Sequence, residues 1–308
     1  MHTSRTATAV LEGDGARGPK GMMWVPGGEF LMGSDHKLSQ RNERPAHKVR
    51  VSGFWMDPTH VTNAQFAAFV KATGYVTTAE RKPDWETIKV QLRPGVPKPP
   101  DSALVPGAMV FVGTERPVPL NDYSRWWAFI PGADWRHPQG PKSSIEGKDD
   151  HPVVQVSYED ALAYAAWLDR IGRLPGARPC NEYEWERAAR GADGRTFPNG
   201  EELLPDDANI DVTYGREPVA FGPDEVGSHP RSRSPVGADD MAGNVWEWTA
   251  SVEQSGAPIA RGGGWYNEAL SARATNREPG EPTQRHVWIG IRMCGNPPLT
   301  DHPAASLR

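Results

Sequence analysis

Three stretches of the chain repeat apolar residues at helical spacing between a polar cap and a glycine. They are predicted as helices: 62–74, 157–172 and 181–191. In the first stretch, Thr62 or Asn63 supplies the N-cap and Gly74 the stop. In the second, Ser157 and Asp160 have the spacing of a capping box. The pattern predicts a few short amphipathic helices with long stretches of other structure between them.

Strand signals are short and lie near the start of the chain. Two apolar runs flank Pro26-Gly27-Gly28, which predicts a β-hairpin between Met22 and Ser34. Residues 47–57 then alternate apolar and polar positions, as a half-buried strand does. We therefore expect a hairpin followed by a further strand before the first helix.

The segment 82–131 is rich in proline and has no clear period, but it contains Trp126 and Trp127 near its end. Large aromatic side chains favour packing, so we expect an ordered surface insertion. The whole chain has 32 Gly, 30 Pro and 12 Trp, a composition suited to many turns with large flat side chains between them. The predicted fold class is α+β, loop-rich and low in regular secondary structure.

No repeat and no linker divides the chain. We predict a disordered tail over residues 1–20, a single domain over 21–298 and a C-terminal tail over 299–308. The formal net charge of -5 and the pI near 6.0 exclude a general cationic surface, so nucleic acid is not an expected partner. No apolar run has the length of a signal peptide core or a membrane span, so we expect a cytoplasmic protein without membrane contact.

The chain has only two cysteines, Cys180 and Cys294. Two are too few for a secreted disulfide framework or a thiolate metal site. One disulfide is an open alternative, and two free thiols are the expected state.

Eight segments, read in order, resemble the successive signatures of the formylglycine-generating enzyme (sulfatase-modifying factor) family. They are GGEFLMGS, VTNAQFAAFV, GADWRHPQGP, DHPVVQVSYEDALAYAAWL, NEYEWERAARG, DDMAGNVWEWT, RGGGWYN and IGIRMC. The resemblance implies one domain of the formylglycine-generating-enzyme fold, a C-type-lectin-like variant whose loops are held by calcium. In family enzymes, two cysteines beside a Gly-Gly-Ser strand bind copper(I) and oxidise a cysteine of an unfolded sulfatase segment to formylglycine.

The two catalytic cysteines of the family are absent from this chain. The first falls on Asn267, and the second falls on Ala272, beside Ser271. Gly264 stands where the family often has serine. Copper(I) needs soft thiolate donors, and neither an amide nor a methyl group supplies one. Standard formylglycine formation is therefore not expected.

The resemblance also bears on the two cysteines that are present. Cys294 aligns with a late structural cysteine of the family, whose disulfide partner would lie in the second predicted helix, where this chain has Ala165. This comparison favours Cys294 as a small buried apolar residue rather than as half of a disulfide.

Calcium is the metal that the resemblance implies, in a structural role. The Asp240 and Glu247 carboxylates and the Gly243 and Val245 carbonyls would bind it, because a hard cation prefers oxygen ligands. The alternative is a buried turn whose acids are satisfied by backbone amides. A second calcium site would begin at Asn209 and Ile210, with Asp224 as a substitute ligand. His60 stands where relatives often carry glutamate.

The altered pocket has five candidate residues: Trp265, Tyr266, Asn267, Ser271 and His286. No two of the nine histidines lie within four residues of each other, so the sequence offers no helical His pair for a metal. A redox metal is not identified by the sequence, nor is the oligomeric state.

Two functions fit these residues. The favoured one is a divergent oxidative tailoring enzyme acting on a small molecule or peptide. The alternative is a non-catalytic paralogue that binds a ligand or protein in the same groove. A cluster of His, Asp or Glu facing the pocket would favour the enzyme, and an apolar pocket would favour the binding protein.

Overall fold

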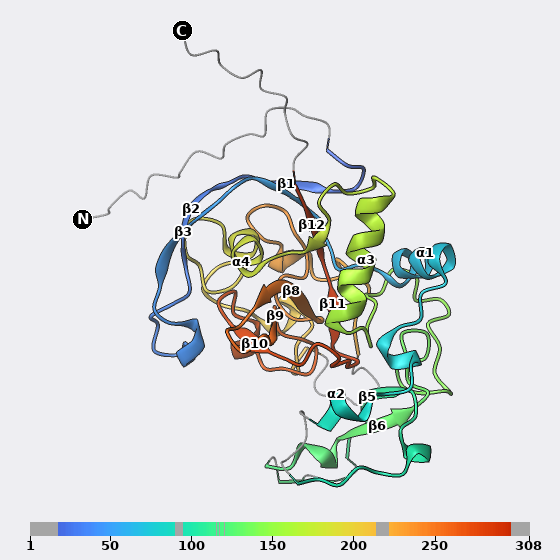
Figure 1. Ribbon diagram of the computed structural model, residues 1–308. Helices are drawn as coiled ribbons and strands as arrows, with labels where there is room; N and C mark the ends of the chain where they lie inside the picture. Colours follow the sequence, from blue (N-terminus) through green and yellow to red (C-terminus); the bar gives the residue numbers. More distant parts are fainter. Residues whose placement is uncertain are drawn as a thin grey trace, which may run out of the picture.

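The structure is a computed structural model, shown in Figure 1. It describes residues 18–89, 95–114, 116, 118–119, 121–213 and 222–296. The tail predicted over residues 1–20 lies outside the described residues except for its last three, and the tail predicted over 299–308 lies wholly outside them.

Two four-stranded sheets form the centre of the molecule. The first has the order β1-β4-β12-β7, with β1 Met23–Val25, β4 Phe54–Met56, β12 Met293–Gly295 and β7 Arg178–Pro179. The second has the order β10-β9-β8-β11, with β8 Trp246–Val252, β9 Pro258–Arg261, β10 Arg277–Pro279 and β11 Ile289–Ile291. Because β4 pairs with both β1 and β12, strands from the two ends of the described chain lie in one sheet.

Two further pairs of strands lie outside these sheets. β2 (Gly28–Met32) pairs with β3 (His47–Val51), and β5 (Gly107–Phe111) pairs with β6 (Trp127–Pro131). The hairpin expected between Met22 and Ser34 is therefore wrong. Its two arms do form strands, β1 and β2, but β1 pairs with β4 and β2 pairs with β3. The strand expected over 47–57 is divided at Ser52 and Gly53 into β3 and β4.

The helices are α1 Asn63–Thr73, α2 Trp85–Lys89, α3 Tyr158–Arg170 and α4 Glu182–Arg190. The three helices predicted from the sequence are confirmed with their caps. Thr62 and Ser157 each accept a hydrogen bond from the backbone N–H three residues on and form capping boxes, as does Asn181 for α4. Gly74 ends α1 in the left-handed conformation, with φ of 68°.

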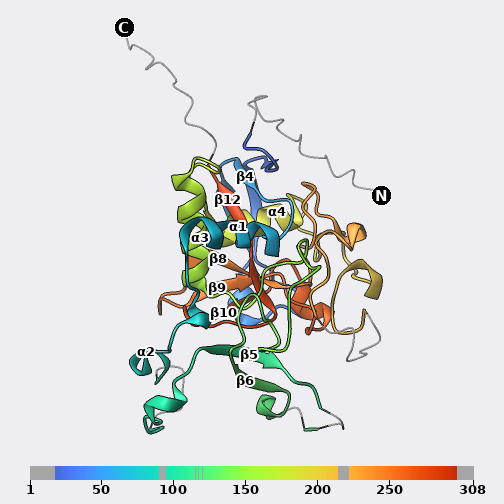
Figure 2. The same cartoon turned by 90° about the vertical axis from the view of Figure 1, so that its right-hand side faces the viewer.

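The core is rich in aromatic side chains. α1 packs against α3 through Phe66, Phe69 and Tyr164, whose ring centroids lie 5.4 to 5.7 Å apart. Figure 2 shows α1 in front of α3 on the same side of the sheets. Trp185 and Trp248 are fully buried between the loops and strands, as expected for residues that fill a loop-rich core.

The part of the 82–131 segment that the structure describes is ordered, as expected. It forms α2 and the β5–β6 hairpin, which lie together at the end of the molecule opposite β12 (Figures 1 and 2). None of the helices among the described residues is long and apolar enough to cross a membrane.

Cys180 and Cys294 form a disulfide, so the expectation of two free thiols is wrong. β7 and β12 are neighbours in the first sheet, where Met293 pairs with Pro179 and Cys294 with Arg178, and this brings the two cysteines together. The partner of Cys294 therefore lies directly after β7, before the N-cap of α4, and not in the second predicted helix. Disulfides form and persist mainly in oxidising compartments, so the cytoplasmic location stays a prediction.

Candidate functional site

The site is built on the glycine turn that follows β9. Gly262 and Gly263 have φ values of 101° and 74°, in the region that favours glycine. A Cβ on Gly263 would lie 3.0 Å from the Ser271 carbonyl oxygen and 3.1 Å from the Ala272 backbone. The turn therefore needs glycine so that residues 271 and 272 can pack directly against it.

Asn267 is a fixed part of this turn. Its side-chain Oδ1 accepts a hydrogen bond of 2.7 Å from the Trp246 indole N–H. Its backbone N–H donates to the Gly264 carbonyl at 2.8 Å, and its carbonyl accepts from the Asp211 N–H at 3.0 Å. At the position where the resemblance implies the first thiol, this chain has an amide whose oxygen is already bonded to Trp246.

Ala272 fills the second position with a methyl group. It is fully buried and packs in a small apolar cluster with Ala208, Ile210 and Ala242. Ser271, one residue earlier, is only partly buried. The second position therefore lies in an apolar cluster and offers no donor to a metal.

Three of the residues predicted to line the pocket, Trp265, Tyr266 and His286, lie in one aromatic cluster. The rings of Phe111, Trp127 and Trp288, which the sequence analysis did not select, complete the cluster. The Tyr266 ring centroid lies 5.2 Å from that of Trp127, 5.4 Å from Phe111 and 5.8 Å from Trp288. The adjacent Trp126 and Trp127, in a segment otherwise poor in pattern, were the signal that could have identified the contribution of the insertion.

A β-bridge and side-chain hydrogen bonds to backbone carbonyls attach the β5–β6 hairpin to this cluster. Met109 of β5 forms a β-bridge with His286, and the Arg285 guanidinium donates to the Gly107 carbonyl at 2.9 Å. Gln155 is buried with a φ of 61°, and its side-chain amide donates to the carbonyls of Met109 and Pro138 at 3.0 and 2.8 Å. The hairpin thereby holds Trp127 against Tyr266.

His286 lies between two indoles, 5.4 Å from Trp127 and 5.6 Å from Trp288 by ring centroid. Burial of the ring lowers the pKa of His286 to about 3, and the charge of Arg285 acts in the same direction. Its Nδ1 is buried and has no hydrogen-bond partner among the described residues. The imidazole is therefore neutral near pH 7 and serves as another flat ring of the cluster.

The predicted calcium ligand Glu247 has several other partners. Its Oε2 accepts from the Trp185 indole N–H at 2.7 Å, and its Oε1 lies 2.9 Å from Nη2 of Arg292 and 3.1 Å from Nε2 of His60. Burial alone would raise the pKa of the Glu247 carboxyl, but Arg292 and His60 outweigh it and lower the pKa to about 2. Glu247 is thus an ionised carboxylate with donors on both oxygens.

Two of the other predicted ligands of the first calcium site, the Val245 carbonyl and the Asp240 carboxylate, also have partners. The Val245 carbonyl lies 3.2 Å from Nε2 of His60, and Asp240 Oδ2 accepts from the Gly227 N–H at 2.7 Å. Gly243, with a φ of 74°, donates its N–H to the Gly262 carbonyl. The Asp240 and Glu247 carboxylates therefore already accept hydrogen bonds from backbone and side-chain donors. This arrangement fits the alternative, a buried turn, better than it fits a calcium site at Glu247.

The second predicted calcium site is internally bonded as well. The Asn209 carbonyl accepts from the Asn244 N–H at 2.8 Å, and the Ile210 carbonyl accepts from the Thr213 N–H at 3.0 Å. Asp224 Oδ2 lies 2.9 Å from Nε2 of His229. Within the described ranges, no group of three or more His, Cys, Asp or Glu side chains is arranged to hold a metal ion. Calcium binding by this chain stays a prediction.

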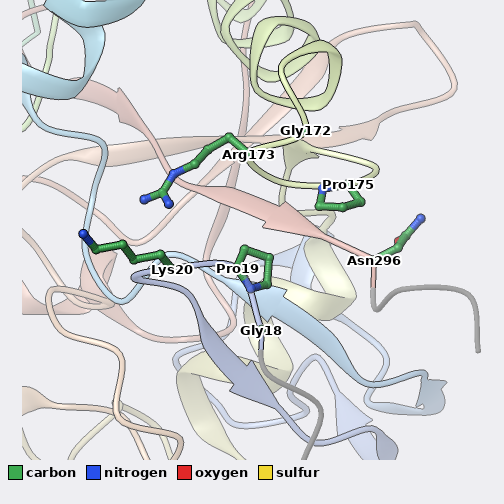
Figure 3. Close-up of a pocket in the computed structure, with 7 residues that line it drawn as sticks. All are labelled: Gly18, Pro19, Lys20, Gly172, Arg173, Pro175 and Asn296. Carbon is green, nitrogen blue, oxygen red and sulfur yellow. The ribbon is translucent and has the colours of Figure 1, made fainter.

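A cavity of about 310 Å³ lies elsewhere on the molecule (Figure 3). It is lined by residues 18–20, Gly172, Arg173, Pro175 and Asn296. The head groups of Lys20 and Arg173 lie on the same side of it in Figure 3. None of the residues predicted for the functional site borders this cavity.

The chain matches the family model described as the sulfatase-modifying factor enzyme 1-like domain over residues 8–297. It belongs to the formylglycine-generating enzyme family. The Mycobacterium tuberculosis formylglycine-generating enzyme is 47% identical over 236 residues, which cover 74% of this chain and 72% of the relative. The sequence resemblance is thereby confirmed, although neither copper-binding cysteine is present.

Relatives with other names belong to the same group. The inactive C-alpha-formylglycine-generating enzyme 2 of Mus musculus is 34% identical, covering 89% of this chain and 85% of the relative. The hercynine oxygenase of Mycolicibacterium smegmatis is 28% identical, covering 87% of this chain and 60% of the relative. The chain is thus similar both to relatives named as enzymes and to one named as inactive.

Among solved structures, PvdO from Pseudomonas aeruginosa superposes with a TM-score of 0.61 at 26% identity, covering 90% of this chain and 94% of that one. This confirms the predicted α+β fold of the formylglycine-generating-enzyme type.

Proposed function

We propose that this chain is a non-catalytic member of the formylglycine-generating enzyme family that binds a peptide segment beside Tyr266 without oxidising it. The observation that carries the proposal is the pair of positions where family enzymes hold copper(I). The amide oxygen of Asn267 accepts a hydrogen bond from the Trp246 indole N–H. Ala272 is buried in an apolar cluster with Ala208, Ile210 and Ala242. Neither residue is a donor for copper(I).

The surroundings of these positions suit binding better than metal chemistry. Tyr266 and Trp288 are only partly buried, and so are Asn267 and Ser271, so each of the four keeps some surface that a ligand can contact. Tyrosine and tryptophan supply large contact areas at low entropic cost, and amide and hydroxyl groups supply hydrogen bonds to a peptide backbone. The name of the inactive mouse relative gives a precedent for a family member without catalysis.

Oxidative tailoring, which the sequence analysis favoured, is the second candidate. The likeness to a protein named hercynine oxygenase supports it. It requires a redox metal held by donors other than thiolates, and the described residues around the aromatic cluster offer the neutral His286 but no group of three such donors. The site geometry therefore supports the binding function more than the oxidative one.

The binding proposal predicts a specific loss in the Tyr266→Ala variant. Removing the ring should weaken binding of a fluorescently labelled sulfatase-type peptide about tenfold, because a central aromatic contact is lost. Fluorescence anisotropy measures the affinity, with circular dichroism to show that the variant is folded. Tyr183→Ala, at an exposed tyrosine of α4, is the matched control and should bind as the wild type does. Equal binding by wild type and Tyr266→Ala would reject the proposed site.

A further inference from the structure

His60 lies in the segment between β4 and α1 and is fully buried. Its Nε2 is 3.1 Å from Oε1 of Glu247 and 3.2 Å from the carbonyl oxygen of Val245. Both neighbours are acceptors, so Nε2 carries the hydrogen that they share. These two acceptors are among the four that the family resemblance assigns to calcium, and here one imidazole N–H faces both.

Arg292, which joins β11 to β12, supplies the main positive charge. Its Nε lies 3.0 and 3.1 Å from the two oxygens of Glu247, and its Nη2 lies 2.9 Å from Oε1. The same guanidinium donates to the carbonyls of Asp57 and Asp239 at 3.1 and 2.8 Å, so it cannot turn away without breaking further bonds. Arg292 and Glu247 are both fully buried.

The Trp185 indole N–H completes the set of donors on Glu247. A carboxylate has about four acceptor positions, and those of Glu247 are taken by the guanidinium, the imidazole and the indole. With these positions taken, a divalent cation could reach the carboxylate only by displacing the imidazole of His60.

We propose that His60 takes the place of calcium at the Glu247 centre of this protein, with Arg292 as the fixed counter-charge of the carboxylate. The centre then ties together β8, α4, the segment before α1 and the link between β11 and β12 through side-chain hydrogen bonds, without a metal ion. This inference concerns the scaffold and stands whether or not the peptide-binding function is correct.

The test exchanges the donor at position 60 for an acid. In His60→Glu, a second carboxylate would face Glu247 and the Val245 carbonyl, and oxygen ligands in that arrangement should bind Ca²⁺. We expect the melting temperature of His60→Glu to rise by about 5–10 °C between excess EGTA and millimolar CaCl₂. The wild type and His60→Gln, whose side chain is neutral, should lack this rise.

Calcium binding measured directly by equilibrium dialysis provides the second readout. His60→Glu should bind one Ca²⁺ more per chain than the wild type, and any ion held elsewhere is common to both proteins. No added binding and no thermal response in a folded His60→Glu would overturn the proposal.

If His60→Glu does not fold even in CaCl₂, dialysis of the wild type and Glu247→Gln decides the question. Calcium bound by the wild type and lost in a folded Glu247→Gln would overturn the proposal. Equal calcium content in the two, including none in either, would support it.

Discussion

Replacing both Cys180 and Cys294 by alanine is expected to lower the free energy of unfolding by about 4 kcal/mol. The disulfide closes a loop between residues separated by 114 positions, so it removes many conformations from the unfolded chain. It also joins β7 to β12, the strand that lies at the centre of the first sheet between β4 and β7. Loss of the crosslink therefore weakens the attachment of the final described strand to the rest of the domain.

Guanidinium-induced unfolding, followed by tryptophan fluorescence, measures this effect. A reductant should lower the stability of the wild type toward that of the double variant and leave the double variant unchanged. Both cysteines are buried, so reduction is best carried out in the unfolded protein before refolding. Equal stability of the oxidised wild type and the double variant would show that the disulfide does not hold β12 in place.

The second large expected effect is an acid sensitivity caused by His286. Burial lowers the pKa of His286 to about 3 in the folded protein, well below the value of 6.5 that an exposed histidine has in the unfolded chain. Between these values the unfolded chain binds more protons, so stability falls as the pH is lowered through 6.5 toward 3. From about pH 7 to about pH 4, we expect His286 to reduce the free energy of unfolding by about 2–3 kcal/mol.

Comparison with His286→Gln isolates this contribution. Asp57 acts in the opposite direction, because burial raises its pKa to about 6 and the folded state then gains stability as the pH falls from 6 toward 3.8. Asp57 is present in both proteins, so the difference in their urea unfolding curves reports on His286. The difference in free energy of unfolding between wild type and His286→Gln should change by about 2–3 kcal/mol between pH 7 and pH 4. The control His47→Gln, at an exposed histidine, should show the same pH dependence as the wild type. Parallel pH profiles for wild type and His286→Gln would contradict the buried, neutral imidazole.

The features that the sequence predicted well are determined by local contacts. Thr62 and Ser157 cap their helices through backbone groups three residues away, so the cap and the apolar stripe are visible in one short window. The arms flanking Pro26 were also recognised as strands, but their partners were not. β1 pairs with β4 and β2 with β3, and local composition does not determine which distant strand fills an edge.

Contacts between distant residues account for the other errors. Cys180 and Cys294 meet only because β7 and β12 are neighbours, and no spacing rule links residues 114 positions apart. Trp265, Tyr266 and His286 were selected from the sequence as pocket candidates, and the structure places them in one aromatic cluster. Trp127 reaches them through the docking of the β5–β6 hairpin, which depends on Gln155 and the loop at His286.

The calcium ligands show a further limit of inference from a motif. The residues Asp240 to Glu247 were assigned as ligands by resemblance, and their types suit calcium. Whether they are free to bind depends on His60 and Arg292, which lie far from them in the sequence. The motif therefore predicted calcium ligands, and the structure was needed to find the cationic partners of Glu247.

The central claim, a formylglycine-generating enzyme fold without its oxidase chemistry, is tested most directly by oxygen uptake. The purified chain is supplied with copper(I), a thiol reductant and a cysteine-containing sulfatase-type peptide, with the Mycobacterium tuberculosis enzyme as the positive control. Oxygen uptake is recorded with an electrode, and the peptide is analysed by mass spectrometry. We predict uptake no faster than in a protein-free sample and a peptide of unchanged mass. Conversion of the peptide cysteine to formylglycine above the protein-free level would contradict the claim and would require donors for copper other than the residues at positions 267 and 272.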